Sequence, residues 1–268
     1  MPKISIGIPT LNGPARLERC LRSIKQHTPL LKYDAEVLVS DDYSYDKNFK
    51  ENKTICHTYR VPMLTTEDRL GVSQQWNRLV RHTDAPIQIL LNDDVEVVPH
   101  WLEALVYSLE QNPHAGVVGL KAYQGVTTIN FTPPIVPSYM EAVMERGSGL
   151  LAAQGFCFGF LKAKWTELEG FDPQFFAFYE EIDFGIRLFE KNWPSYMLSY
   201  PIILHQGGAT TSDSGNIDAS AVLLESREKF KRKHPAISEI RAHMDAVVAN
   251  HIWPPVKQWN TGLLVTQD

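Results

Sequence analysis

The stretch that decides the fold is Ile87-Gln88-Ile89-Leu90-Leu91-Asn92-Asp93-Asp94-Val95-Glu96-Val97-Val98. Its apolar first half is typical of a buried strand in a parallel sheet. The strand ends abruptly in Asn92-Asp93-Asp94, where neighbouring carboxylates repel each other unless a positive group lies nearby. Because ligands bind at the carboxyl edge of open α/β sheets, this ending predicts a divalent cation shared with a phosphate-bearing substrate. The alternative is a pair of solvated carboxylates in a turn before the helix that begins near Pro99.

The composition bounds the class of protein. The chain has 268 residues, of which 44% are hydrophobic and 21% charged, as expected for a soluble globular protein with one large domain or two small ones. A net charge of −5 argues against a general nucleic-acid binder. The cysteines (Cys20, Cys56 and Cys157) are far apart and predict neither a zinc site nor a disulfide framework. With no long apolar run and no signal peptide, we expect a cytoplasmic protein.

Polar clusters also follow two earlier strands. Ile4–Ile8 ends in Pro9-Thr10-Leu11-Asn12, and Ala35–Val39 ends in Ser40-Asp41-Asp42. Since parallel strands end on the same edge, we expect four carboxylates to be able to converge on one crevice: Asp41, Asp42, Asp93 and Asp94. The alternative is that these residues only start turns, as Asp and Asn often do.

The remaining pattern alternates strands and helices. Apolar residues recur at helical spacing in residues 14–28, 72–82 and 99–111, and a further strand is predicted at 115–120. Residues 43–65 are hard to interpret, although a short strand near 59–64 is plausible. This alternation predicts a doubly wound α/β fold with a mostly parallel, Rossmann-like sheet flanked by helices. Residues 124–149 have no sustained period, which is typical of a functional or mobile segment.

A second acidic cluster lies in Glu180-Glu181-Ile182-Asp183, within a predicted helix. Asp183 and Arg187 are four residues apart and can pair along that helix, which favours a structural role for Asp183. Glu180 and Glu181 are expected at the helix N-terminus, either as simple caps or as a general base aimed into the crevice. His205 ends the last predicted strand, where a structural role and a ligand role are equally supported.

The C-terminal part is predicted to be helical from Asp218 to about Lys233 and to be basic. A solvated helix face is the default interpretation, and contact with an anionic membrane surface or acceptor is the alternative. We expect the end of the chain, around 252–259, to pack back on the domain. The predicted division is one domain at 1–215, in two halves at 1–123 and 124–215, followed by a helical extension at 216–268 that packs on it.

Taken together, these stretches resemble the family-2 glycosyltransferases, which have the GT-A fold, over roughly residues 3–210. The resemblance implies that a nucleotide lies against the strand ends and against a glycine followed six residues later by an asparagine. The positions that match these nucleotide-contacting residues are Pro9, Thr10, Asn12, Asp41, Asp42, Gly71, Asn77, Asn92 and Asp93.

The same resemblance implies a metal site and a catalytic base. Asn92-Asp93-Asp94 is similar to the family's Asp-x-Asp element, so Asp94 would hold Mn²⁺ or Mg²⁺ together with His205 and Asp93. Residues 180–187 resemble the family's Glu-Asp-x-Asp helix, which makes Glu181 the base, with Asp183 and Glu180 in reserve.

The chain departs from the family pattern at several positions. Tyr43 replaces the usual glycine, and Arg69 stands where asparagine is frequent. Asn92 replaces the first aspartate of the metal element, a variant that resembles rhamnosyl- and related transferases. Glu181 stands where the base is usually aspartate, and its carboxylate reaches one methylene further.

The implied function is an inverting, metal-dependent glycosyltransferase that moves a sugar from a UDP- or dTDP-sugar to a hydroxyl of a glycan or a lipid-linked acceptor. With a lipid-linked acceptor, the protein could rest on the inner face of the membrane. Two other functions stay open. One is a non-catalytic protein that binds sugar nucleotides or glycans. The other is a nucleotidyltransferase, although Leu11–Arg16 has only one glycine where such an enzyme needs a glycine-rich phosphate loop.

Overall fold

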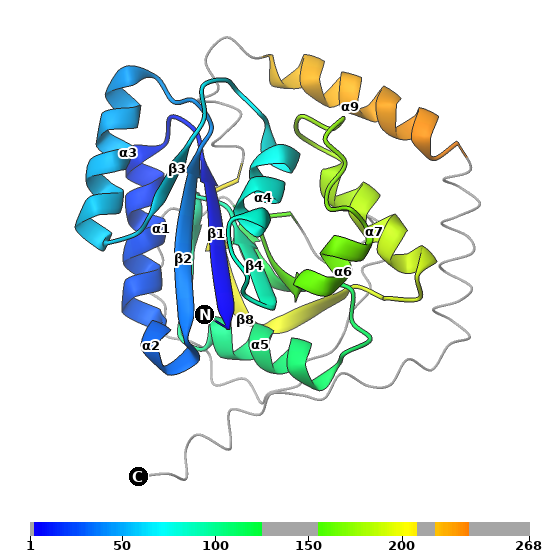
Figure 1. Cartoon of the computed structure of the whole chain (residues 1–268), viewed down its shortest axis with the longest axis horizontal. Coiled ribbons are helices and arrows are strands. Elements are labelled where there is room, and N and C mark those ends of the chain that lie inside the picture. Colours follow the sequence, from blue (N-terminus) through cyan, green and yellow to red (C-terminus); the bar gives the residue numbers. More distant parts are fainter. Residues whose placement is uncertain (1–2, 125–154, 208–217, 236–268) are drawn as a thin grey trace.

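Helices cover both faces of a central sheet in the computed structural model, which describes residues 3–124, 155–207 and 218–235 (Figure 1). Most of the predicted irregular segment at 124–149 and the predicted packing of 252–259 lie outside the described residues. No helix in the described part of the chain is both long and apolar enough to cross a membrane.

The described strands form one sheet in the order β3-β2-β1-β4-β7-β6-β8-β5. Four of its seven pairings are parallel, so the prediction of a mostly parallel α/β sheet is confirmed. The strands are β1 (Ile4–Thr10), β2 (Ala35–Asp41), β3 (Met63–Thr65), β4 (Ile87–Leu91), β5 (Val95–Glu96), β6 (Val118–Gln124), β7 (Cys157–Leu161) and β8 (Tyr196–His205).

The central strands alternate their side chains between two apolar layers. Ile6 and Ile89 face a core shared with α1, α3 and α5, whereas Leu38 and Leu90 face a core shared with α4, α6 and α7. This alternation follows from the period of two in a strand. The helices on the two faces are α1 (Pro14–His27), α3 (Asp46–Tyr59), α5 (Trp101–Gln111), α4 (Val72–Arg81), α6 (Lys162–Glu167) and α7 (Glu180–Glu190).

The segment at 43–65 differs from its prediction. The structure has a helix, α3, where the sequence showed no clear element, and the predicted strand near 59–64 begins only at Met63. Only Asn52 and Cys56 of α3 are buried, so the helix shows almost no apolar stripe in its sequence. A short helix, α2 (Leu30–Tyr33), was likewise not predicted.

The last described helix is α9 (Ala219–Lys233), which matches its predicted bounds. Asp218 caps it, because its Oδ1 accepts hydrogen bonds from Ser220 N at 2.9 Å and from Ala221 N at 3.2 Å. Phe230 joins Phe175 and Ile186 in a small apolar cluster, so α9 packs over the region of α7 (Figure 1).

Candidate active site

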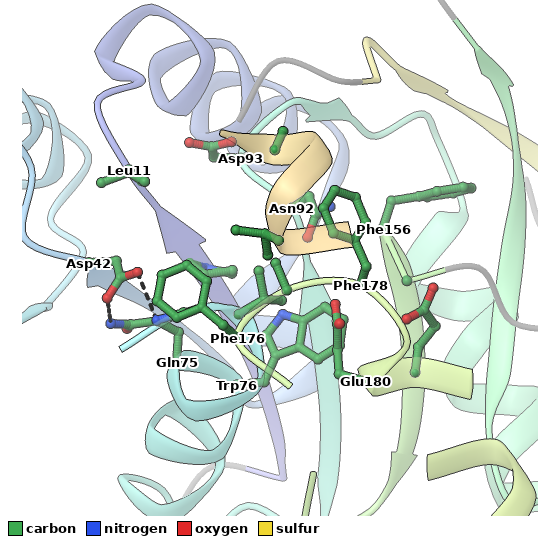
Figure 2. A pocket seen from close by; sticks show the side chains of 18 of the residues that line it. Leu11, Asp42, Gln75, Trp76, Asn92, Asp93, Phe156, Phe176, Phe178 and Glu180 are labelled. Atoms are coloured by element: carbon green, nitrogen blue, oxygen red, sulfur yellow. Dashed lines mark hydrogen bonds between the residues drawn. The ribbon is translucent and has the colours of Figure 1, made fainter. Parts of the chain in front are cut away.

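A cavity of about 580 Å³ lies at the carboxyl ends of β1 and β4. From β1 the sheet order continues through β2 and β3 on one side and through β4 on the other, and such a switch point is the usual ligand crevice of an open α/β sheet. Figure 2 shows polar and aromatic side chains together in this cavity. Its lining residues are Pro9, Thr10, Leu11, Asp42, Gly71, Val72, Gln75, Trp76, Asn92, Asp93, Asp94, Gly155, Phe156, Phe176, Ala177, Phe178, Glu180, Glu181, His205, Ala219, Ser220, Val222 and Leu223.

The structure brings most of the predicted site residues to this cavity. Those that line it are Pro9, Thr10, Asp42, Gly71, Asn92, Asp93, Asp94, Glu180, Glu181 and His205. Four predicted residues are not part of the lining, and each has partners elsewhere that explain its position: Asn12, Asp41, Asn77 and Asp183.

Asp93 ties the ends of β1 and β4 together. Its Oδ2 accepts a hydrogen bond from Thr10 Oγ1 at 2.7 Å, and its Oδ1 lies 3.3 Å from Arg16 Nε. Burial raises the pKa of Asp93 to about 6, although the Arg16 charge and the Thr10 hydroxyl act in the opposite direction. Because both oxygens are already engaged, Asp93 is better suited to bracing the site than to ligating a metal.

Asp94 and His205 face each other at a place where two strands pair. Val95 is the register partner of His205, and Gln206 N donates to Asp94 O at 3.0 Å. This pairing brings His205 Nε2 to 3.3 Å from Asp94 Oδ1. The His205 ring lies against Phe156, with a centroid distance of 4.4 Å, which fixes its orientation.

The residues at this place fit a divalent metal. Asp94 Oδ1 has His205 Nε2 nearby but accepts no hydrogen bond from the described residues, and His205 Nδ1 likewise has no hydrogen-bond partner among them, although both atoms are buried. A carboxylate with an imidazole is compatible with Mn²⁺, whereas Mg²⁺ prefers oxygen ligands alone. No group of three or more His, Cys, Asp or Glu side chains suited to a metal occurs in the described ranges, so a bound ion would need further ligands from substrate or water.

The two aspartates after β2 have different roles. Asp42 lines the cavity and accepts hydrogen bonds from Gln75 Nε2 at 2.7 Å and from Gly71 N at 3.1 Å. Asp41 is 1% exposed, and its two oxygens accept from Ser44 N and from the Asn52 side chain, both at 2.8 Å. In this structure the Asp41 carboxylate holds its own loop together and does not line the cavity, and its contact with the nucleotide stays a prediction.

Two predicted asparagines also hold loops rather than face the cavity. Asn12 Oδ1 accepts from Tyr45 N at 2.7 Å, which joins the loops after β1 and β2. Asn77, which the resemblance placed beside the nucleotide, is 2% exposed and does not line the cavity. Its amide accepts from Phe171 N at 2.8 Å and from Trp165 Nε1 at 3.2 Å, and it donates to Phe171 O at 2.7 Å. These bonds anchor the turn before α7 onto α4.

Gly71 lets α4 meet that turn closely. Its φ is +80°, and a Cβ placed on it would lie 2.3 Å from Phe176 O. The next residue, Val72, donates its N–H to the same carbonyl at 2.7 Å. Only glycine combines this backbone conformation with this close approach. The contact places Phe176 in the cavity wall (Figure 2).

The acidic pair begins α7 as predicted. Burial raises the pKa of Glu180 well above its ordinary value, and the neighbouring Glu181 charge raises it further. Burial also raises the pKa of Glu181, against backbone hydrogen bonds that lower it. Within the described part of the chain, Oε2 of each side chain lacks a hydrogen-bond partner. Two such carboxylates at a helix N-terminus can accept protons or hydroxyl hydrogens from a substrate.

Asp183 points to a different set of partners. It is 0% exposed and contacts Arg187 Nε at 2.8 Å, Lys233 Nζ at 2.6 Å and His234 Nε2 at 2.8 Å. The predicted pairing of Asp183 with Arg187 is confirmed. These three partners hold the carboxylate between α7 and α9 and away from the cavity lining, so its reserve role as a base stays a prediction that the geometry does not favour.

Several lining residues were not singled out in the sequence. Trp76 was assigned to the apolar stripe of its helix, and the aromatic residues after Phe175 carried no motif. The contribution of α9 had no signal at all, because Val222 and Leu223 come from a helix that begins 29 residues after the end of α7. A common feature does identify the site: five buried side-chain atoms that lack hydrogen-bond partners among the described residues belong to its lining. They are Trp76 Nε1, Asp94 Oδ1, Glu180 Oε2, Glu181 Oε2 and His205 Nδ1.

Solved structures of sugar transferases share this fold. A mannosyltransferase of Pyrobaculum calidifontis, PcManGT, in complex with GDP-Man and Mn²⁺, matches with a TM-score of 0.62 at 16% identity, covering 99% of this chain and 79% of that one. TarS 1-349 of S. aureus in complex with UDP-GlcNAc matches with a TM-score of 0.58 at 14% identity, covering 87% and 73%. At these identities the likeness shows the GT-A fold.

Sequence comparison identifies the family. A validoxylamine A glucosyltransferase of Streptomyces hygroscopicus subsp. jinggangensis (strain 5008) is 31% identical over 127 residues. The aligned part is 47% of this chain, and the chain spans only 28% of that relative's length. The model of "Glycosyl transferase family 2" matches residues 5–168, which is more than half of the 268 residues. The chain therefore belongs to glycosyl transferase family 2.

Proposed function

We propose that this enzyme is an inverting, metal-dependent glycosyltransferase that uses a nucleoside diphosphate sugar, either a UDP- or a dTDP-sugar, and a hydroxyl acceptor of a glycan or a lipid-linked sugar. The observation that carries the proposal is one cavity, at the switch point of the sheet, that contains both the Asp94–His205 pair and the Glu180–Glu181 pair. The relatives whose names include GDP-Man and UDP-GlcNAc support a sugar nucleotide as donor.

The nucleotide would lie along the strand ends, beside Thr10 and Asp42. Asp94 and His205 would hold Mn²⁺ or Mg²⁺ near the diphosphate. When bound, such an ion supplies positive charge that stabilises the leaving diphosphate. Asp93, braced by Thr10 and Arg16, keeps the end of β4 in place.

Glu181 would accept the proton of the attacking acceptor hydroxyl. Its raised pKa brings the carboxyl closer to the working range of a general base, and its free Oε2 can accept a hydrogen bond. Attack on the anomeric carbon from the face opposite the diphosphate gives inversion. Glu180 lies next to it and is the second candidate for the same proton.

The test is release of nucleoside diphosphate from a panel of UDP-, dTDP- and GDP-sugars, with Mn²⁺ or with EDTA. We expect slow, metal-dependent hydrolysis of one donor by the wild type, and its loss in Asp94→Asn. Asp84→Asn is the matched control, because the Asp84 side chain is 80% exposed and pairs only at 3.4 Å with Lys162. If no donor in the panel is hydrolysed and no nucleotide shifts the unfolding temperature, the proposal is contradicted. A thermal shift without turnover on any acceptor would favour a binding protein instead.

A further inference from the structure

The indole of Trp76 is an unusual feature of the cavity. Trp76 is 1% exposed, lies on α4 and lines the cavity, yet its Nε1 has no hydrogen-bond partner among the described residues. A buried donor without an acceptor loses its hydration and gains nothing in return. Such a group in a binding cavity points to an acceptor supplied by a ligand.

Elsewhere the protein satisfies its buried indoles. Trp101 Nε1 donates to Thr28 Oγ1 at 2.8 Å, and Trp165 Nε1 donates to Asn77 Oδ1 at 3.2 Å. Trp76 therefore differs from both other tryptophans that are fully enclosed in the described core, and it is the one that reaches the cavity.

The Trp76 ring is fixed by its neighbours. It packs edge-on against Phe158, with a centroid distance of 5.2 Å and an interplanar angle of 80°, and it lies 5.0 Å from the Phe171 ring. The indole N–H is thus held in a set direction before any ligand arrives, which reduces the ordering cost of a bond to it.

The ring also lies close to the acidic pair. A Cβ placed on Gly155 would be 3.4 Å from Trp76 Cη2 and 3.4 Å from Glu181 Cδ, so both side chains lie against the same glycine. Figure 2 shows the indole of Trp76 and the carboxylate of Glu180 pointing into the same cavity. The cavity thus offers one donor and two carboxylates with unpartnered oxygens in one region.

This combination selects the chemistry of the ligand. Neither a phosphate oxygen nor an ether oxygen carries a hydrogen to donate, so either one would leave the oxygens of the glutamates unpaired. A hydroxyl accepts from the indole and donates to a carboxylate, so it satisfies both. The low exposure of Trp76 places this contact in the innermost part of the cavity, where the donor lies, rather than at the opening where an acceptor enters.

We propose that Trp76 Nε1 donates a hydrogen bond to a hydroxyl of the transferred sugar and thereby contributes to donor specificity. This inference rests on the proposed function, because it assumes a nucleoside diphosphate sugar in the cavity. It adds a residue that recognises the transferred sugar to a site whose other groups, in the proposed function, contact the nucleotide, the metal or the attacking hydroxyl.

The test compares Trp76→Phe with wild type on the donor that the panel identifies, without acceptor. Phenylalanine keeps an aromatic ring but removes the N–H. We expect kcat/KM for donor hydrolysis to fall by about 10- to 100-fold, while the Kd of the free nucleoside diphosphate stays within about twofold. Donors that lack a single sugar hydroxyl identify the partner of the indole. For one of them, wild-type kcat/KM should fall by the same factor, and Trp76→Phe should hydrolyse this donor no more slowly than it hydrolyses the complete one.

Trp101→Phe is the matched control. It removes an indole N–H that has a partner outside the cavity, so it should lower the unfolding midpoint and leave donor hydrolysis unchanged. Wild-type rates in Trp76→Phe would overturn the inference. So would parallel losses of donor turnover and diphosphate affinity, or a loss that occurs only with an acceptor present. A wild-type protein that neither binds nor hydrolyses any donor would overturn the proposed function first, so the two failures are distinct.

Discussion

Asp183→Asn should destabilise the protein strongly without removing catalysis. The Asp183 carboxylate is completely buried and has three partners, Arg187, Lys233 and His234, at 2.6–2.8 Å. A neutral amide at this position keeps the shape of the side chain but removes the charge that balances two cations. The perturbation therefore acts on the contact between α7 and α9.

The magnitude follows from the burial of the cluster. Breaking a buried ion pair from one side costs about 3–5 kcal/mol, because the remaining charge is left without compensation. The Lys233 side chain is 27% exposed, so water screens part of its charge. We therefore expect a loss near the lower end, about 3 kcal/mol of the free energy of unfolding.

Urea unfolding of Asp183→Asn and of Asp172→Asn measures this difference. Asp172 binds the same Lys233, but its side chain is 22% exposed, so its loss should cost less than about 1 kcal/mol. If the losses of unfolding free energy in the two variants differ by less than about 1 kcal/mol, Asp183 is not the centre of a buried ion cluster between α7 and α9, and the reasoning is refuted.

Activity separates this role from that of the base. Folded Asp183→Asn should retain most donor turnover, whereas Glu181→Gln should lose about 10²–10⁴-fold with its stability intact. Glu190→Gln, on the exposed end of the same helix, controls for the substitution itself. The opposite pattern, an inactive but folded Asp183→Asn beside an active Glu181→Gln, would make Asp183 the base.

Three further variants test the cavity wall. The raised pKa of Glu180 means that the folded state binds more protons than the unfolded state above pH 4.5, so stability should fall as pH rises through that window, by about 1.4 kcal/mol per pH unit for a full proton. Glu180→Gln should reduce this slope in urea unfolding at a series of pH values, while the raised pKa values of Glu181 and Asp93 keep part of it, and an unchanged slope would contradict the prediction. Gly71→Ala should lower both the unfolding midpoint and donor turnover, because its Cβ would meet Phe176 O at 2.3 Å; wild-type behaviour in calorimetry would contradict this clash. Ser226→Ala should cost about 1–3 kcal/mol and reduce turnover, since Ser226 Oγ donates to Ala177 O at 2.7 Å; an active variant of normal stability would show that this bond is dispensable.

The sheet and its binding edge could be predicted from the sequence because they depend on local patterns. Alternating apolar residues in β1 and β2 and the continuous apolar run of β4 identify the strands, and polar endings such as Asn92–Asp94 identify the edge. The cap at Asp218 similarly sets the start of α9. Each of these signals lies within a few residues of the structure that it determines.

Which carboxylates line the cavity and which are bound by other side chains could not be predicted in this way, because their partners are distant in sequence. Asp41 is engaged by Asn52 on a helix that the sequence did not reveal. Asp183 is engaged by His234, 51 residues later. A free carboxylate in a cavity and a satisfied one in a loop look the same in sequence, because only the fold determines which donors reach them.

The position of the acidic pair is set jointly by α4, which lies within the family match, and by α9, which lies beyond the end of that match at residue 168. Phe178 and Tyr179, directly before the pair, have φ values of 66° and 71°, a conformation that costs about 1–2 kcal/mol for each residue. The turn is held from both sides, since α4 donates to Phe176 O through Val72 N and α9 donates to Ala177 O through Ser226 Oγ.

A strained turn persists only where its surroundings fix it. In this molecule α4 belongs to the family-matched part, whereas α9 follows it. The matched part supplies the edge that would hold a nucleotide, and α9 both braces the turn that carries the glutamates and lines the cavity through Val222 and Leu223. Changes in α9 should therefore alter how the glutamates meet an acceptor hydroxyl while leaving nucleotide binding intact, so we expect acceptor choice to depend partly on a helix beyond the family-matched residues.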